Sequence, residues 1–449
     1  MDFNHFKELV FLLGRDKFDD LELYRNEEKT LSIHVFNGEI DKYAIAESSG
    51  VSFRGLKDGK MGYAFSETLD DASARLLIEQ AYDNAKYIDT TDLTPIFEPS
   101  DEYMINNQIK NKIDEVSIDE KIELMKKLEK TALSLDNRIT SLQSCIYEEY
   151  NISKEIYNSK GLDLKEAGGG AVIYMGVVAK DDNDTKTGSA LRMFRDFKDI
   201  DIEDIAKESV NEAVSLLNAK PIKSNDYTTI IKGNVFADIL EAFFPTFSAE
   251  NAQKGLSQLK DKTGEVIASD VFTILEDPLC EMGFALSTFD DEGNATMYKK
   301  IVENGKLNTL LYNGKAALKA GVAPTGNGFR ESYKTPISTK GTNILVKIGE
   351  KSLDELVSNI DNGVLVTHVA GLHSGLNPVS GDFSMQAQGF LIEEGKITKG
   401  INGVTVAGNF FSMLMDIEEV GSDIKFGFPS GSHFGSPSVK LKKLSIAGS

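Results

Sequence analysis

The 449-residue sequence has few of the residues that form covalent or metal-bound scaffolds, with only two cysteines and five histidines. Cys145 and Cys280 cannot make a disulfide framework, and they indicate a protein of a reducing, cytoplasmic compartment. No stretch approaches the roughly 18 consecutive apolar residues that a membrane-spanning helix needs. The first residues also lack the basic start and the apolar stretch of a secretion signal. These features predict a cytoplasmic protein.

Positive charge is also scarce, because 49 Lys and Arg residues face 70 Asp and Glu residues, which gives a net charge of −21. The composition is otherwise globular, with 41% hydrophobic and 27% charged residues. Nucleic acids and anionic membranes are bound mainly through Lys and Arg. We therefore expect neither a nucleic acid nor a membrane among the partners of this chain.

Charge and glycine are unevenly distributed about Pro221. Residues 1–220 carry a net charge of −16 and 12 glycines, whereas residues 221–449 carry −5 and 26 glycines. Charged, glycine-poor sequence is typical of solvated amphipathic helices, and glycine-rich sequence with short β-branched runs is typical of tightly turned antiparallel sheet. We predict an α+β protein of two domains. Residues 1–220 form an N-terminal α/β domain with an antiparallel meander and helices, in sub-blocks 1–90 and 117–220, and residues 221–449 form a mainly antiparallel β domain.

Local signals place several elements in these domains. The Asn37-Gly38 and Asp58-Gly59 pairs predict two-residue hairpins, because both supply positive φ angles. Ser117 and Glu120 form a capping-box pattern that starts a helix. The other expected elements are helices over 2–13, 70–87, 202–217 and 235–244, the last ended by Pro245, and a strand over 227–231.

Familiar catalytic motifs are absent from the sequence. It contains no phosphate-binding G-x-x-x-x-G-K-[ST], no G-x-S-x-G nucleophile elbow and no H-E-x-x-H. His368 and His373 are the only close histidine pair, and strand-like sequence places them on opposite faces without a third ligand nearby. We interpret them as ordinary polar positions and Cys145 as a buried thiol. The acids of residues 290–292 precede a glycine in turn-like sequence, so we expect them to be solvated.

Several stretches resemble the TldD/PmbA family of bacterial and archaeal peptidase-complex proteins. The resemblance runs in matching order over essentially the whole chain and is most specific in the C-terminal half. The matching stretches are residues 62–66 (Gly-Tyr-Ala-Phe-Ser), 158–161 (Asn-Ser-Lys-Gly), 290–293 (Asp-Asp-Glu-Gly), 324–328 (Pro-Thr-Gly-Asn-Gly), 376–384 (Leu-Asn-Pro-Val-Ser-Gly-Asp-Phe-Ser), 389–395 and 404–409.

The resemblance also implies which type of subunit this chain is. TldD-type members carry H-E-x-x-x-H on a helix and bear zinc, whereas PmbA (TldE)-type members lack that motif. At the equivalent place here Leu240 and Pro245 replace the histidines, only Glu241 remains, and residues 421–437 contain no cysteine. The chain is therefore identified as the PmbA type, with no catalytic residue, metal or cofactor of its own. Glu241 is then either a remnant of the motif or an ordinary helix residue.

The function that the resemblance implies is that of a subunit in a zinc metallopeptidase complex. A TldD-like partner would supply zinc, and the substrate would be an unfolded or modified peptide bound through backbone hydrogen bonds to a strand edge. Asn377, Gly381, Asp382 and Phe383, in the most family-specific stretch, are candidates for a peptide-binding or interface loop. The same stretch is equally consistent with a tight turn that requires Gly381.

Two other functions stay open on the sequence alone. One is a non-proteolytic binding or regulatory protein, since the family is also described as a modulator of DNA gyrase. The other is an independent peptidase that uses His368, His373 or His433 in an unfamiliar site. A homodimer of the isolated chain is compatible with either function and with the complex.

Overall fold

The computed structural model describes residues 1–88, 94–105 and 111–448. The helices are α1 (Phe3–Gly14), α2 (Asp71–Tyr87), α3 (Ile118–Leu135), α4 (Ile202–Ser215), α5 (Gly233–Phe243), α6 (Ala249–Gln253), α7 (Gly314–Ala320), α8 (Leu353–Ser358) and α9 (Phe410–Met415). The strands are β1 (Asp20–Phe36), β2 (Glu39–Lys57), β3 (Lys60–Ser66), β4 (Ile139–Asn158), β5 (Asp163–Lys180), β6 (Thr185–Phe194), β7 (Asn225–Ile231), β8 (Ile274–Glu276), β9 (Lys299–Glu303), β10 (Lys306–Leu307), β11 (Gly328–Phe329), β12 (Ser338–Thr339), β13 (Asn343–Val346), β14 (Asn362–Ala370), β15 (Asp382–Glu393), β16 (Lys396–Asn409), β17 (Ile417–Val420), β18 (Lys425–Phe426), β19 (His433–Ser436) and β20 (Val439–Ala447).

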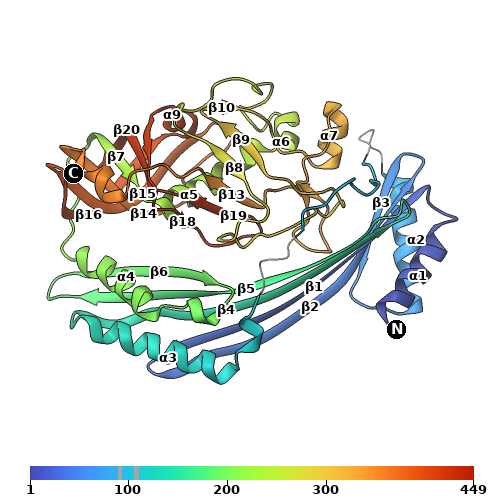
Figure 1. Ribbon diagram of the computed structural model, residues 1–449, viewed down its shortest axis with the longest axis horizontal. Helices are drawn as coiled ribbons and strands as arrows, with labels where there is room; N and C mark the ends of the chain where they lie inside the picture. The colour runs from blue at the N-terminus through green and yellow to red at the C-terminus, as the bar shows by residue number, and fades with distance from the viewer. Residues whose placement is uncertain (89–93, 106–110, 449) are drawn as a thin grey trace.

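The N-terminal domain is built on one long antiparallel sheet with the strand order β3-β2-β1-β4-β5-β6. Strands β1, β2, β4 and β5 each run for 17 to 20 residues, and Figure 1 shows them arching below the C-terminal domain. Asn37-Gly38 and Asp58-Gly59 both have positive φ and close the predicted hairpins, which are confirmed. The predicted sub-blocks 1–90 and 117–220 both contribute strands to this sheet, and the connection predicted between them lies partly outside the described residues.

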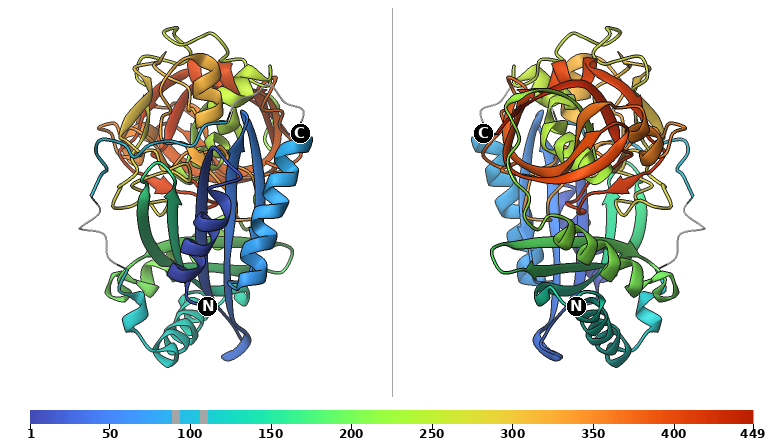
Figure 2. Two further views of the ribbon diagram at one scale, coloured as in Figure 1. Left: turned by 90° about the vertical axis from the view of Figure 1, so that its right-hand side faces the viewer. Right: turned by 90° about the vertical axis from the view of Figure 1, so that its left-hand side faces the viewer.

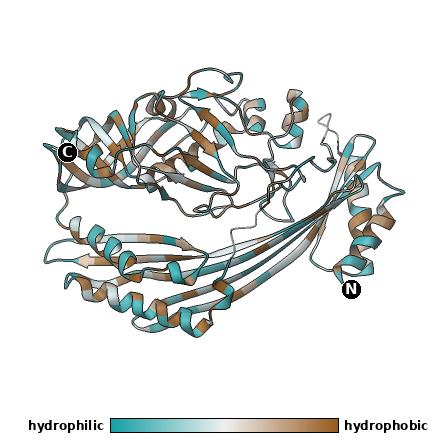
Figure 3. Ribbon diagram, viewed as in Figure 1, coloured by the Kyte–Doolittle hydropathy of each residue, from teal (hydrophilic) through white to brown (hydrophobic). Residues whose placement is uncertain are grey.

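The two faces of the N-terminal sheet have different neighbours, because successive side chains of a strand point to opposite faces. On β1, Leu23 packs with residues of α1 and α2, and Ile33 packs with residues of α3 and α4. The alternate residues face the C-terminal domain, where Tyr24 packs against Phe289 and Tyr333. In Figure 2 the C-terminal domain lies on one side of the sheet in both views, and in Figure 3 the helices contain both hydrophobic and hydrophilic residues. The face of the sheet that points towards the C-terminal domain carries the polar residues, such as Glu28 and Glu148, that line the cleft described below.

The C-terminal domain contains two larger sheets. One has the order β10-β9-β8-β13-β19-β18, and the other has the order β16-β15-β14-β7-β20-β17. In the second sheet β16 also pairs with β20, so the five strands β16, β15, β14, β7 and β20 close into a barrel. Most pairs are antiparallel, with parallel pairing between β7 and β14 and between β13 and β19. The predicted α+β class is confirmed, and α5 lies between the sheets near the centre of the domain (Figure 1).

The observed helix ends agree with the capping and proline signals in the sequence. Asp70 and Ser117 cap α2 and α3 through capping boxes, as the Ser117 pattern predicts. Helix α5 ends at Phe243 and continues as a 3₁₀ turn, Phe244–Phe247, that contains Pro245. None of the helices in the described part of the chain combines the length and apolar character needed to cross a bilayer.

Candidate functional site

Helix α5 carries a polar face. Asn234, Asp238 and Glu241 follow one another at intervals of four and three residues, which places their side chains on one side of a helix. Burial and the neighbouring Glu241 raise the pKa of Asp238 to about 7. Burial also raises the pKa of Glu241, although the hydroxyl of Ser430, which donates to its carboxylate, and the nearby His373 oppose that shift. Two carboxyl groups thus share a partly buried helix face.

A neighbouring face of the same helix is apolar and belongs to the core. Phe236, Leu240 and Phe243 have no exposed surface. The Phe243 ring stacks on Phe410 with centroids 4.5 Å apart, and it meets Phe383 edge-on. This face of α5 therefore packs in the core of the C-terminal domain. Leu240 is part of the buried stripe, whereas Glu241 belongs to the polar face.

Glu241 and Pro245 border a cleft of about 320 Å³. Its other side is formed by Ser430 and Ser432 and by residues 338–341. The described residues contain no group of three or more His, Cys, Asp and Glu side chains placed to hold a metal ion. The predicted absence of a metal site in this chain remains a prediction.

The three histidines considered as catalytic candidates lie in separate places. His368 is exposed on β14, but the strand ends at Ala370 because Gly371 turns with φ +95°. The expectation that His373 lies on the opposite face of the same strand is therefore wrong. His433 is fully buried, and its Nδ1 accepts the amide of Phe284 at 3.1 Å.

The surroundings of His433 assign it a structural role. Because Nδ1 accepts a hydrogen bond, Nε2 carries the proton and donates it to the carbonyl of Gly427 at 3.2 Å. The ring stacks on Phe426, and burial lowers its pKa to about 4. A neutral imidazole with both nitrogens occupied is not available as a proton carrier. Cys145 is buried and unpaired, as predicted, and burial raises its pKa to about 12.

The loop with the four predicted interface residues forms a tight turn. The side chain of Asn377 accepts the amides of Val379 and Ser380, and the amide of Gly381 donates to the carbonyl of Asn377 at 2.8 Å. Gly381 has φ +82°, which an L-residue rarely adopts.

The two remaining loop residues have protein partners. Asp382 accepts a hydrogen bond from Asn409, and Phe383 is 4% exposed and packs on Phe243. The turn thus satisfies its own polar groups and buries its aromatic ring. A peptide-binding or interface role for the loop remains a prediction.

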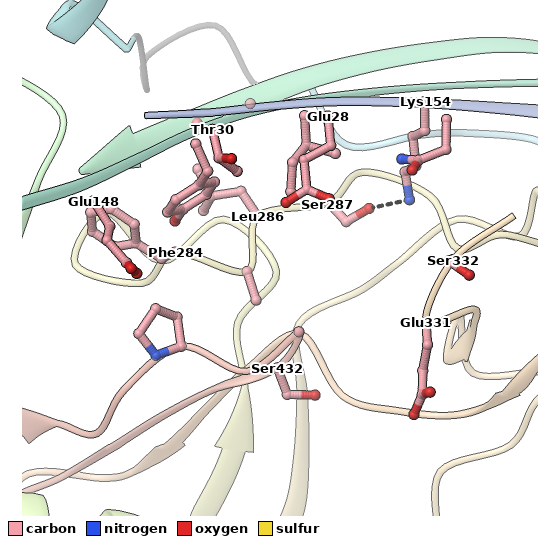
Figure 4. Close-up of a pocket in the computed structure, with 18 of the residues that line it drawn as sticks. Glu28, Thr30, Glu148, Lys154, Phe284, Leu286, Ser287, Glu331, Ser332 and Ser432 are labelled. Atoms are coloured by element: carbon pink, nitrogen blue, oxygen red, sulfur yellow. Dashed lines mark hydrogen bonds between the residues drawn. The ribbon is translucent and has the colours of Figure 1, made fainter. Parts of the chain in front are cut away.

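A central cleft of about 680 Å³ lies between the N-terminal sheet and the C-terminal domain. Figure 4 shows Glu28, Thr30 and Glu148 reaching from the sheet towards Phe284 and Ser432 of the C-terminal domain. The cleft also touches residues 340–341 and Ser432, which border the cleft beside Glu241. An open path along the sheet therefore adjoins the Glu241 position.

Lys154, on β4, forms hydrogen bonds from the sheet to the C-terminal domain at the central cleft. Its Nζ donates to Ser287 Oγ at 2.9 Å (Figure 4). It also donates to the carbonyl of Phe289 at 2.8 Å and to Asp291 at 3.1 Å. Glu166, from the neighbouring strand, accepts the Ser287 hydroxyl and the amide of residue 288. The sheet and the 287–291 segment are thus held in a fixed relation at one end of the cleft.

The acids at residues 290–292 are buried, which corrects the expectation that they are solvated. Asp290, Asp291 and Glu292 are 0%, 4% and 1% exposed. The carboxylate of Asp290 accepts amides of residues 292, 294 and 328. Burial and the charge of Glu292 raise the pKa of Asp290. A turn-like sequence does not show that a second domain covers it, which is why the expectation failed.

Two buried arginines, Arg54 and Arg330, supply positive charge close to these acids and to Glu22. Arg54 binds Glu22 with two hydrogen bonds of 2.8 and 2.9 Å, and its guanidinium lies 3.7 Å from Glu292. Arg330, from the C-terminal domain, donates to Glu22 at 3.2 Å and to Ser52 at 2.6 Å. Because buried charges cost free energy unless they are paired, this cluster holds the domains in one arrangement.

Sequence reasoning missed Asp238 and the buried charge cluster. The signal for Asp238 was present, since polar residues at 234, 238 and 241 interrupt an otherwise apolar helix at the spacing of one face. Glu22 and Arg54 carried a weaker signal, as charged residues among buried strand residues. Their partner, Arg330, lies some 300 positions away in the chain, so spacing could not reveal it.

Comparisons with known proteins match one family along most of the chain. Sequence profiles described as PmbA/TldA metallopeptidase domain 1, central domain and C-terminal domain match residues 21–85, 111–217 and 224–448. A relative named Metalloprotease PmbA from Escherichia coli O157:H7 is 24% identical over 443 residues, covering 97% of this chain and 94% of that protein. A Metalloprotease from Methanothermobacter thermautotrophicus is 26% identical, covering 96% of both chains.

Solved structures show the same similarity. A Thermotoga maritima structure, described as a proposed modulator of a DNA gyrase, is 34% identical with a TM-score of 0.91, covering 99% of this chain and all of that chain. The structure of TldE from Thermococcus kodakarensis is 26% identical with a TM-score of 0.90, at the same coverage. This chain therefore belongs to the PmbA/TldD family of metallopeptidases.

Proposed function

We propose that this chain is the TldE-like subunit of a zinc metallopeptidase complex and works without a zinc ion of its own. A TldD-like partner supplies the metal and the general base, and the substrate is an unfolded or modified peptide. The names of the relatives, which include PmbA, TldD and TldE proteins, support this assignment. The unpaired Cys145 and Cys280 support a cytoplasmic location.

The observation that carries the proposal is the surroundings of the three motif positions on and after α5. Leu240 lies in the buried apolar stripe, and Pro245 lies in a 3₁₀ turn where its ring nitrogen has no lone pair to offer a metal. Glu241 keeps a carboxylate at a cleft, but its nearest hydrogen-bond partner is the hydroxyl of Ser430. Without a metal, nothing lowers the pKa of a water molecule beside Glu241 towards neutrality.

The central cleft gives this subunit a role in binding the peptide. It is open and lined by the face of a long sheet, with small residues at Ala44, Ala46 and Gly168. An extended peptide can lie along such a surface with room for its side chains. The buried cluster of Glu22, Arg54 and Arg330 holds both walls in place during binding.

The proposal predicts that cleavage depends on a second chain. The test measures hydrolysis of an unstructured fluorophore–quencher peptide by this chain, by a TldD-type chain with the H-E-x-x-x-H motif, and by their mixture. We expect no hydrolysis by this chain alone and hydrolysis by the mixture. Changing the Glu of the partner's motif to Gln should lower the rate by about a thousandfold or more, because it removes the general base of a zinc-bound water.

The matched variant in this chain is Glu241→Gln. It preserves size and the contact with Ser430, and we expect the rate of the mixture to change by less than about twofold, because Glu241 has no metal-bound water to activate. Hydrolysis by this chain alone, abolished by Glu241→Gln, would contradict the proposal.

A further inference from the structure

A second interdomain cavity, of about 990 Å³, lies on the α4 side of the molecule. We call it the lateral cavity. One wall is built by β6 and α4, and the other by the start of α5, the end of β14 and residues 424–428. Figure 1 shows α4 and β6 facing β14 and β18 across this region. It adjoins the central cleft at Arg195, Phe284 and Phe428, which line both.

The strand topology explains why polar groups gather in the lateral cavity. Strands β7 and β14 are parallel neighbours, so their carboxyl ends lie at the same edge of the sheet. The chain leaves β7 at Ile231 and enters α5, and the amide of Lys232 donates to the carbonyl of Val366 at 3.0 Å. The first turn of α5 therefore lies beside Thr367, at the bulge where β14 changes register.

Hydrogen-bond acceptors without partners line this part of the cavity. The side-chain oxygens of Asn234 and Thr367 are buried and have no hydrogen-bond partner, and Thr367 is only 8% exposed. In the described part of the chain, the Asp238 carboxylate forms no hydrogen bond or ion pair. Asn234 and Asp238 stand one turn apart on α5, so their side chains are neighbours. Leaving such groups unsatisfied costs free energy, which a bound ligand can recover.

The lysine and arginine side chains of the lateral cavity are already engaged. Arg192, Lys232 and Lys425 all approach Glu208, the two lysines at 3.4 and 3.7 Å, and Arg192 also binds Asp204 at 2.6 Å.

The two other lysine and arginine side chains of the cavity are also engaged. Lys112 pairs with Asp196 at 2.7 Å. Arg195 donates to the carbonyls of Glu281 and Gly283. No lysine or arginine that lines the cavity is therefore left to pair with the side-chain oxygens of Asn234, Asp238 and Thr367.

We propose that the lateral cavity binds an ammonium group, which is held by Asp238, Asn234 and Thr367. An ammonium group brings three N–H donors and a positive charge, and these match a carboxylate, an amide oxygen and a hydroxyl oxygen. The rings of Phe426 and Phe428 line the same cavity and suit the aliphatic stem that carries the cation.

The choice of a peptide as the carrier rests on the proposed function. The ammonium then comes either from the side chain of a lysine or from the free amino terminus of the peptide. Both present the same group, and peptides that contain one or the other distinguish the two sources.

Calorimetric titration of the full-length chain alone tests the proposal. The probes are Ac-Ala-Ala-Lys-Ala-NH₂, H-Ala-Ala-Ala-Ala-NH₂ and the neutral Ac-Ala-Ala-Ala-Ala-NH₂. We expect at least one ammonium peptide to bind about tenfold or more tightly than the neutral peptide, since a charge-assisted hydrogen bond is lost with the cation. Equal binding of all three peptides would overturn the inference but would leave the proposed function intact, because cleavage by the mixture is a separate measurement.

Two isosteric variants locate the site. Asp238→Asn should weaken ammonium binding by about tenfold or more, and Thr367→Val by a few-fold, through loss of an acceptor. Neither change removes a hydrogen bond within the protein, so both variants should fold, which circular dichroism checks. Ser144→Ala is the matched control, because it removes another buried hydroxyl without a partner, on β4 and outside the cavity. Unchanged ammonium binding in both cavity variants, or equal losses in the control, would overturn the assignment.

Discussion

Replacing Arg330 with methionine should lower the free energy of unfolding by about 3 kcal/mol, because it removes one partner from a buried ionic cluster. Methionine keeps most of the volume but leaves the Ser52 hydroxyl without its 2.6 Å partner and removes one cation from Glu22. The guanidinium also lies 4.7 Å from the centre of the Tyr24 ring, a contact that is lost with the charge. Urea unfolding followed by circular dichroism measures the change.

The Arg330 variant should also show which part of the protein is destabilised. Hydrogen exchange should accelerate at the amides of residues 292, 294, 328 and 330, which donate to the carboxylates of Asp290 and Asp291. Arg138→Met is the control, because Arg138 makes an exposed pair with Asp136 and its loss should hardly move the unfolding midpoint. Equal midpoints for the two variants would show that the buried cluster does not hold the domains together.

Leu240→His should destabilise the protein by about 3 kcal/mol or more, because an imidazole would replace a fully buried leucine. Leu240 shares its stripe with Phe236 and Phe243, and both rings are fully buried. No polar group of this stripe is available to receive the imidazole. Thermal unfolding of the variant and of the unchanged chain measures the loss.

Ala242→His is the matched control, since position 242 on the same helix is only partly buried. It should cost far less than Leu240→His. The double variant Leu240→His/Pro245→His restores the letters of the zinc motif, and we expect it to retain less than about one-tenth of a zinc ion per chain, because ligand geometry and not residue type alone decides binding. A stable double variant with one bound zinc would show that α5 remains a metal-binding helix.

Local physics explains which parts of the fold could be predicted from sequence. The Asn37-Gly38 and Asp58-Gly59 turns and the cap at Ser117 depend on backbone preferences of a few adjacent residues, and the structure has each of them. The closure of the barrel by β16 and β20 depends on contacts between distant segments. Such pairings leave no trace in the spacing of a single sequence.

In the candidate site, too, local features could be predicted from the sequence and contacts between distant segments could not. The replacement of the motif histidines by Leu240 and Pro245 is legible in the sequence once the family is recognised, and the structure adds that Leu240 is packed in the core. The burial of residues 290–292 could not be foreseen, because their charge partners come from distant strands of the N-terminal sheet: Arg54 of β2 lies beside Glu292, and Lys154 of β4 pairs with Asp291. The tight turn at Gly381 was one of two readings that the sequence left open, and the structure has it with the positive φ that a glycine permits.

Zinc content is the most direct test of the central claim that this chain supports, and does not perform, metal-dependent hydrolysis. Elemental mass spectrometry on the full-length chain, purified without a metal-affinity tag, gives zinc per chain. We predict less than about one-tenth of an equivalent, because α5 supplies no pair of histidines. About one equivalent that is lost on His368→Ala or His373→Ala would contradict the account and would make this chain a metallopeptidase in its own right.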